Sequence, residues 1–305
     1  MTNETVDPNW PEFGDYITGL TFDFPEDVRN GANTTEPVIL YRSILAAADD
    51  ASITIVVIGD FDNIYHLFIS EADDISPLSG YDLITSKVSE LVVQAAAYGE
   101  SFNLYNHNAT FAETVIDAWP ETIPLTLVGS NIGGQTFFGA RLTTELDLAV
   151  NPVAYAFNKS IGYNVTHKTW DATAMYYAIR GLDDVYAFNF TSGRVEADAD
   201  ADTTWVAANE TLQNALIWKE GGIGNASFAE RLEDILLWQP GEVIPTNLRG
   251  LLTCVNGTNT TVASNVSATA AVPSATGYQY SGADIGRTMS VAGWAVVMAA
   301  GLYVL

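Results

Sequence analysis

The chain has 305 residues, and its 12 Lys and Arg against 37 Asp and Glu give a formal net charge of −25 at pH 7. Nucleic acids and anionic lipid surfaces are bound through clustered basic side chains, so this composition argues against both as partners. The single cysteine, Cys254, provides no disulfide framework and no cysteine-based zinc site, and we interpret it as an incidental thiol.

The first half of the chain alternates helical and strand patterns. Residues 53–59 are a continuous β-branched run, typical of a strand buried on both faces, and 91–93 and 123–129 are further apolar runs. Helical spacing is found over residues 38–48, 63–70 and 111–119. This alternation predicts an α/β fold with a doubly wound, mostly parallel sheet. Its functional site should lie at the carboxyl ends of the strands, after Ile58, Ala97 and Val128.

The second half continues the same domain. Residues 171–181 predict a helix that opens with Asp and stops at Gly, 185–190 and 203–207 predict short strands, and 228–238 predict a last helix. The globular domain is therefore expected over residues 1–250, enough for one large core. No Gly-X-Gly-X-X-Gly or Walker loop is present, so a nucleotide cofactor is not supported.

Eleven Asn-X-Ser/Thr acceptor sites indicate a secreted glycoprotein, because such sites are used only in the secretory pathway. The chain nevertheless opens with a polar run that cannot be a signal peptide. We therefore expect that Met1 is not the natural start, and that a signal peptide and part of the domain precede it. The acceptor asparagines are Asn3, Asn33, Asn108, Asn158, Asn164, Asn189, Asn209, Asn225, Asn256, Asn259 and Asn265.

The C-terminal region predicts a surface anchor. Residues 251–282 are mostly Ser, Thr, Ala and Asn, a composition that cannot bury a core, and we interpret them as a glycosylated stalk. Residues 283–305 place a polar spacer before an apolar run from residue 291, the order of a GPI-attachment signal; a buried terminal helix is the alternative. The expected location is extracellular, on a membrane or cell wall through this anchor. Self-association is left open.

Three stretches of the chain resemble the inosine-uridine-preferring nucleoside hydrolase family in its secreted fungal and bacterial branch. They are SITIVVIGDFDNIYHLF with the SPLSGYDLITSKVSELVV that follows it, SFNLYNHNATFAETVIDAWPETIPLTLVGSNIGG, and TWDATAMYYAIRGLDDVYAF. The two parts of the first stretch begin at residues 52 and 76, and the other two stretches begin at residues 101 and 169. The likeness covers most of residues 10–240. The resemblance implies an N-ribohydrolase that splits a ribonucleoside into base and ribose.

The family binds Ca²⁺ with aspartates, and a metal-bound water, deprotonated by an Asp, attacks the anomeric carbon. Carried over to this chain, the resemblance implies that Asp171 and the backbone carbonyl of Ile58 are Ca²⁺ ligands, and that Asn103 binds the ribose hydroxyls. Asn131 stands where relatives carry an acidic residue, and Trp170 where some carry a His; both are expected beside the substrate. From the residues alone, Asp171 is equally a helix cap and Asn103 a turn residue.

This sequence also departs from the family pattern. The family's Asp-X-Asp-X-X-X-Asp-Asp cluster, which supplies the general base and two metal ligands, has no counterpart in the 305 residues. Alanines at 95–97, Ser101 and His107 also replace family residues. One hypothesis is a hydrolase whose N-terminal βα unit is missing from this sequence; the other is a glycosylated, non-catalytic surface relative. The first predicts that residues 1–250 alone are poorly soluble, because a buried strand edge would be exposed.

The remaining titratable groups predict no second site. His66, His107 and His167 have no partner at metal-ligand spacing and are interpreted as structural or solvated. The acidic pairs at 26–27 and 73–74 and the acidic run at 198–202 are interpreted as solvated loops.

Overall fold

The structure is a computed structural model that describes residues 34–189, 192–208 and 211–238, six residues between 16 and 24, and the backbone of 295–299. The predicted stalk at 251–282, most of the predicted signal at 283–305, Cys254 and six of the acceptor asparagines lie outside these residues.

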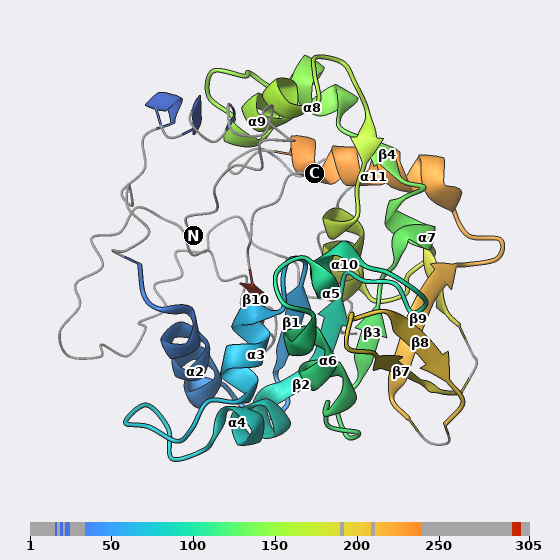
Figure 1. Ribbon diagram of the computed structural model, residues 1–305. Helices are drawn as coiled ribbons and strands as arrows, with labels where there is room; N and C mark the ends of the chain where they lie inside the picture. The colour runs from blue at the N-terminus through green and yellow to red at the C-terminus, as the bar shows by residue number, and fades with distance from the viewer. Residues whose placement is uncertain are drawn as a thin grey trace, which may run out of the picture.

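A six-stranded sheet, in the order β10-β1-β2-β3-β9-β6, forms the centre of the molecule (Figure 1). All neighbouring strands are parallel except β6 and β9, which pair antiparallel. The predicted mostly parallel α/β sheet is therefore confirmed. The strands are β1 Ile53–Val57, β2 Val88–Val93, β3 Leu125–Leu127, β6 Tyr186–Phe188, β9 Gln213–Trp218 and β10 Ala295–Ala299.

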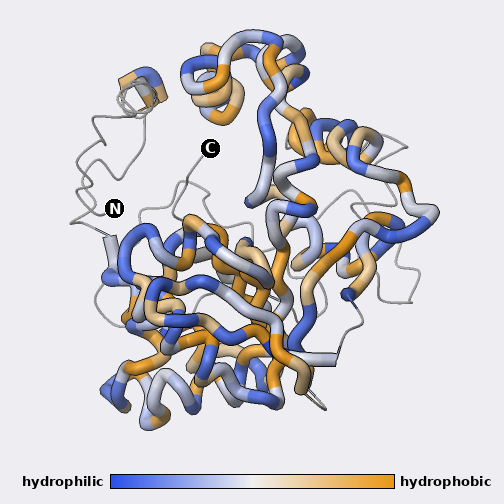
Figure 2. Tube along the Cα trace, turned by 45° about the vertical axis from the view of Figure 1, so that its right-hand side comes forward, coloured by the Kyte–Doolittle hydropathy of each residue, from blue (hydrophilic) through white to orange (hydrophobic). Residues whose placement is uncertain are grey.

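Helices cover both faces of the sheet, as a doubly wound fold requires. Alternate residues of β1 enter opposite cores: Ile55 and Val57 pack with helices α2 to α6, whereas Val56 packs with helices α7 to α11. Along the trace, hydrophobic stretches follow the central strands and hydrophilic stretches lie mostly at the periphery (Figure 2). Two apolar cores, one on each face, therefore hold the sheet.

The first core is covered by α2 Pro37–Ala47, α3 Asp62–Phe68, α4 Gly80–Lys87, α5 Phe102–Tyr105 and α6 Ala109–Asp117. The second core is covered by α7 Ser130–Gly133, α8 Ala140–Glu145, α9 Pro152–Ser160, α10 Asp171–Arg180 and α11 Gly224–Leu237.

Two small antiparallel hairpins complete the described fold. One pairs β4 Phe137–Phe138 with β5 His167–Lys168, and the other pairs β7 Arg194–Ala197 with β8 Thr203–Val206. Val195 and Trp205 of the second hairpin pack on the first core, so this hairpin adds to the cover on that face of the sheet.

Several predicted boundaries shift by a few residues. The strand expected over 123–129 is only β3. It begins after Pro124, which has no N–H to donate, although the Pro124 carbonyl still accepts from Leu91 of β2 at 2.9 Å. Among the described residues no helix is long and apolar enough to cross a membrane. Residues 295–299 form a strand, so the alternative of a terminal helix is wrong for these five residues.

Candidate functional site

The carboxyl ends of three parallel strands meet at one edge of the sheet, where the sequence placed the site. The strand ends are tied together by backbone hydrogen bonds, because Gln94 donates to the Val57 carbonyl at 2.9 Å and Val128 donates to the Val93 carbonyl at 2.8 Å. Ile58 therefore stands directly beside the first residue after β2.

Asn103, on the short helix α5, reaches back to the end of β2. Its Nδ2 donates to the backbone carbonyl of Gln94 at 3.1 Å and to the Gln94 Oε1 at 2.7 Å. These bonds span nine residues and join a helix to a strand end, so Asn103 is not acting as a local turn residue. No described residue donates to its Oδ1, which leaves an amide oxygen to accept a hydrogen bond from a ligand.

Asn131, on α7, is fixed to the strand on the other side of β3. Its Nδ2 donates to the Leu216 carbonyl at 2.8 Å, and its own carbonyl accepts from the Trp218 Nε1 at 3.0 Å. Gly129 has to be glycine at this packing distance: a Cβ there would lie 2.9 Å from the Asn131 Oδ1 and 3.3 Å from the Ala96 Cα. The loops that follow β2 and β3 are thus in close contact.

A hollow of about 400 Å³ opens beside these two loops. Its lining is mostly apolar, with two amides, a hydroxyl and a phenol among the side chains. Asn131 is the one predicted site residue that lines it; Asn103, Trp170 and Asp171 do not. The lining residues are Ala96, Ala97, Tyr98, Leu127, Gly129, Ser130, Asn131, Asn189, Ala215, Leu216 and Ile217.

Trp170 contacts Ser130, one of the residues that line the hollow. Its indole Nε1 donates to the Ser130 hydroxyl at 3.2 Å, and the Lys168 ammonium lies 5.9 Å from the ring centroid. The His167 ring packs edge-on against it at 6.2 Å. Trp170 is thus held by α7 and by the β4–β5 hairpin, and its donor is already used.

Asp171 is the first residue of α10, a helix that packs on β1 and β2. The predicted cap is wrong, because the helix has no side-chain capping bond and the capping position itself is Trp170. Within the described chain no hydrogen bond or ion pair engages the Asp171 carboxylate. Burial without a partner raises its pKa to about 7, from an ordinary value of 3.8.

The described residues do not amount to a calcium site by themselves. Ca²⁺ takes six to eight oxygens. The predicted ligands, Asp171 and the Ile58 carbonyl, supply two groups, and no cluster of three or more His, Cys, Asp or Glu side chains suited to a metal occurs in the described ranges.

The histidines behave as structural or solvated groups. His107 is half-exposed, with its Nδ1 2.6 Å from the Asp62 Oδ1, and it joins the loops after β1 and β2 at their outer rim. His66 packs against the Phe111 ring at 5.3 Å. Asp198 accepts from the backbone of Asp200 and Asp202, both at 3.0 Å, and so closes a solvated turn in the acidic run.

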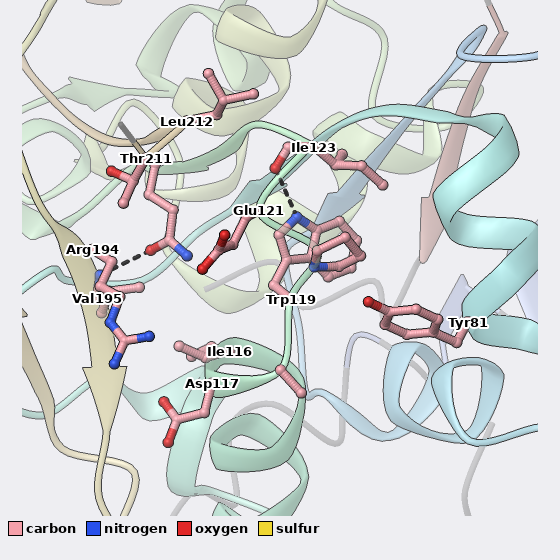
Figure 3. A pocket seen from close by; sticks show the side chains of 13 residues that line it. Tyr81, Ile116, Asp117, Trp119, Glu121, Ile123, Arg194, Val195, Thr211 and Leu212 are labelled. Carbon is pink, nitrogen blue, oxygen red and sulfur yellow. Dashed lines mark hydrogen bonds between the residues drawn. The ribbon is translucent and has the colours of Figure 1, made fainter. Parts of the chain in front are cut away.

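A second, smaller hollow of about 170 Å³ lies at the opposite, amino end of the sheet (Figure 3). Trp119 forms one wall, and its Nε1 donates to the Ile123 carbonyl at 3.1 Å. Arg194 and Glu121 stand at its mouth. None of the predicted site residues reaches this hollow, and we assign it no part in the site.

Sequence reasoning missed the residues that hold the site together. Gln94, which binds Asn103, was not singled out, although its place directly after a strand was a usable signal. Ser130 and Trp218, which position Trp170 and Asn131, gave no local signal, because their bonds bridge residues 40 and 87 positions apart.

No family model matches this sequence, and no curated relative matches it. Similarity is found among solved structures. A plant nucleoside hydrolase is 16% identical with a TM-score of 0.49, over 77% of this chain and 74% of that one. A purine-preferring ribonucleoside hydrolase from Gardnerella vaginalis is 12% identical with a TM-score of 0.48, over 70% of this chain and 69% of that one. At these values the similarity decides neither activity nor substrate.

Proposed function

We propose that this chain is a nucleoside hydrolase-like domain, which binds a ribonucleoside at the carboxyl edge of its sheet and serves the hydrolysis of the N-glycosidic bond to base and ribose. One observation carries the proposal. Three groups that the family resemblance assigned from separate parts of the sequence, Asn103, Asn131 and Asp171, stand at the same edge, and two of them hold polar atoms that no described residue engages.

The chemistry of each group suits a nucleoside. The hollow has a mostly apolar lining, against which a planar heterocycle can pack, and the Asn131 and Ser130 side chains at its rim can hydrogen-bond ring nitrogens or exocyclic groups. The free Oδ1 of Asn103 can accept from a ribose hydroxyl, while the Gln94 backbone and side chain keep its amide oriented. The Asp171 carboxylate can accept from a second hydroxyl, or bind a cation that does so.

None of these residues is proposed as the general base. In the family an aspartate outside the matching stretches deprotonates the attacking water, and no residue of this chain is assigned that role. What these residues support is binding and orientation of the sugar, which is a substantial part of catalysis because correct placement removes entropy from the barrier.

Equilibrium binding of inosine and uridine tests the proposal. We expect Asn103→Ala and Asp171→Asn each to weaken binding about tenfold or more. The first removes the amide oxygen that accepts a hydrogen bond, and the second replaces a charged acceptor by a neutral one. Thr85→Ala, on the exposed face of α4, is the control and should bind like the parent. Binding without release of base would favour the non-catalytic surface relative, and absence of binding of both nucleosides would refute the proposal.

We also propose that the protein is an extracellular glycoprotein. All five acceptor asparagines within the described residues are at least partly exposed, namely Asn108, Asn158, Asn164, Asn189 and Asn225. Protein recovered from the native cell should lose mass when treated with a peptide N-glycosidase, and an unchanged mass would count against this location.

A further inference from the structure

Asn189 is both a glycan acceptor and a residue of the candidate site. It opens the acceptor triplet Asn189-Phe190-Thr191, and it is one of the residues that line the hollow of about 400 Å³. The other four acceptor asparagines within the described residues do not line this hollow. A glycan at Asn189 would therefore begin inside the space that a ligand has to enter.

The backbone holds Asn189 at this place. Its N–H donates to the Ala215 carbonyl at 2.8 Å, one residue beyond the pair in which Phe188 of β6 lies opposite Leu216 of β9. Residues opposite one another in an antiparallel pair carry their side chains on the same face of the sheet. Asn189 and Ala215 therefore share a face, and Ala215 also lines the hollow.

The side-chain amide of Asn189 is not committed to the described fold. The residue is partly exposed, and no described residue forms a hydrogen bond with its side chain. Asn225, another acceptor, differs in this respect, because its Nδ2 donates to the Gln135 carbonyl at 2.9 Å. A glycan on Asn189 therefore displaces no hydrogen bond that the described residues make.

We propose that Asn189 carries an N-linked glycan whose first sugars lie over the hollow, so that glycosylation of Asn189 closes the candidate site and its absence opens it. The transfer joins the Asn189 Nδ2 to the anomeric carbon of a lipid-linked oligosaccharide. The lipid diphosphate leaves, and the Nδ2 releases one of its two protons. This closure rests on the proposed extracellular location, because such glycans are added only in the secretory pathway.

Exposed apolar side chains around the hollow suit a sugar ring. Tyr98 and Ile217 line the hollow and are 59% and 39% exposed. The C–H face of a sugar packs on aromatic or aliphatic surface, while its hydroxyls meet water or an amide such as that of Asn131. A branched oligosaccharide is bulkier than a nucleoside, so one that is attached within the lining excludes the smaller ligand.

Glycopeptide mapping of protein recovered from the native cell is the first test. We expect Asn189 to carry sugar. A bare Asn189 beside glycosylated Asn108 or Asn225 would overturn the proposal and leave the extracellular location standing. Bare asparagines at every acceptor position would overturn both.

Thiol labelling then measures access to the hollow without any nucleoside. The full chain is secreted from a glycosylating host in a Cys254→Ser background, with Ser130→Cys as the reporter, because Ser130 lines the hollow and is exposed. Thr191→Ala removes the acceptor triplet but keeps Asn189, whereas Thr191→Ser keeps the triplet. We expect a maleimide to label the Thr191→Ala protein about tenfold or more faster than the parent or the Thr191→Ser protein, because a covered thiol reacts slowly.

Two controls separate the hollow from general effects of glycans. Ser227→Ala removes the acceptor triplet of Asn225, which does not line the hollow, and should leave the labelling rate of the reporter unchanged. A reporter on the exposed face of α4, Thr85→Cys, should react equally fast with and without the Asn189 glycan.

Enzymatic removal of the glycan repeats the comparison without a substitution at residue 191. A peptide N-glycosidase releases the sugar and turns Asn189 into Asp, and it should raise the labelling rate of the parent to that of the Thr191→Ala protein. Equal rates with and without the Asn189 glycan would overturn the proposal.

Discussion

The unpaired carboxylate of Asp171 should make the folded chain less stable at neutral pH than at mildly acidic pH. Burial raises its pKa to about 7 in the folded state, whereas in the unfolded chain it titrates near 3.8. Below pH 4 the Asp171 carboxyl group is protonated in both the folded and the unfolded state, so it does not lower the free energy of unfolding. Between pH 4 and 7 the unfolded state ionises first, so the stability falls as the pH rises, and above pH 7 the full penalty remains.

The size of the penalty follows from the shift. A difference of about three pKa units corresponds to about 4 kcal/mol, since each unit is worth 1.36 kcal/mol. Part of the carboxylate surface still meets water, and we therefore expect about 2 to 4 kcal/mol. Asp171→Asn keeps the size of the side chain and cannot ionise, so it should stabilise the protein by this amount at pH 8 and by much less at pH 5.

Urea unfolding of both proteins at pH 5 and pH 8, in the presence of a metal chelator, measures this difference. Asp73→Asn is the control, and its destabilising effect should be the same at pH 5 and pH 8. Asp73 accepts two hydrogen bonds from Arg42, which hold its pKa at about 2, so its stabilising contribution is present above pH 4 and is lost as the pH falls toward 2. If Asp171→Asn changed the stability equally at both pH values, burial of an ionisable carboxylate at this position would be refuted.

Three further substitutions test the packing of the fold by thermal or urea unfolding. Glu233→Ala should lower the stability by about 2 kcal/mol, because the buried Glu233 Oε1 accepts from two backbone N–H groups at the start of α8, those of Gly139 at 2.7 Å and Arg141 at 3.2 Å. Glu233→Gln keeps an acceptor and should lower it less. Arg42→Met should lower the stability by about 3 kcal/mol, since the buried guanidinium donates to two backbone carbonyls of the loop before α4, which would lose this hydrogen-bond donor. An unchanged unfolding midpoint would contradict this. Gly139→Ala should destabilise far more than Gly181→Ala: both have positive φ, but a Cβ at 139 would lie 2.1 Å from a carbon of the Phe157 ring and one at 181 meets open space.

The sequence was sufficient for the central parallel strands, because continuous β-branched runs leave little choice of structure. Two missed helices carried readable signals. Ser79 caps α4 by accepting from Asp82 at 3.1 Å, and Asn151 caps α9 by accepting from Ala154 at 2.9 Å, just before a proline at the first helical position. These helices were predictable from capping chemistry alone.

Strand β9 was not predictable in the same way. The sequence QNALIW begins with two amides and shows neither a continuous apolar run nor clean alternation. It becomes an interior strand because β3 and β6 pair with its two edges and because the Asn131 side chain bonds its backbone. Tertiary contacts of this kind override local preference.

The same division applies to the candidate site. Residue type and position after a strand singled out Asn103 and Asp171, but sequence could not decide between a structural and a ligand-binding role for either. The structure adds what each side chain bonds. The Asn103 Nδ2 donates to two oxygens of Gln94, and no described residue donates to the Asn103 Oδ1. Asp171 is at the start of a helix, but its carboxylate neither caps that helix nor forms an ion pair with a described residue.

The alanines at 95–97 have a structural reason at this edge. A Cβ at Gly129 would already lie 3.3 Å from the Ala96 Cα and 3.4 Å from the Ala95 carbonyl oxygen, so the loops after β2 and β3 approach each other at backbone distance. Ala96 and Ala97 also line the hollow, where larger side chains would fill the space that a ligand needs. Small side chains at these positions therefore keep the two loops in close contact and the hollow open.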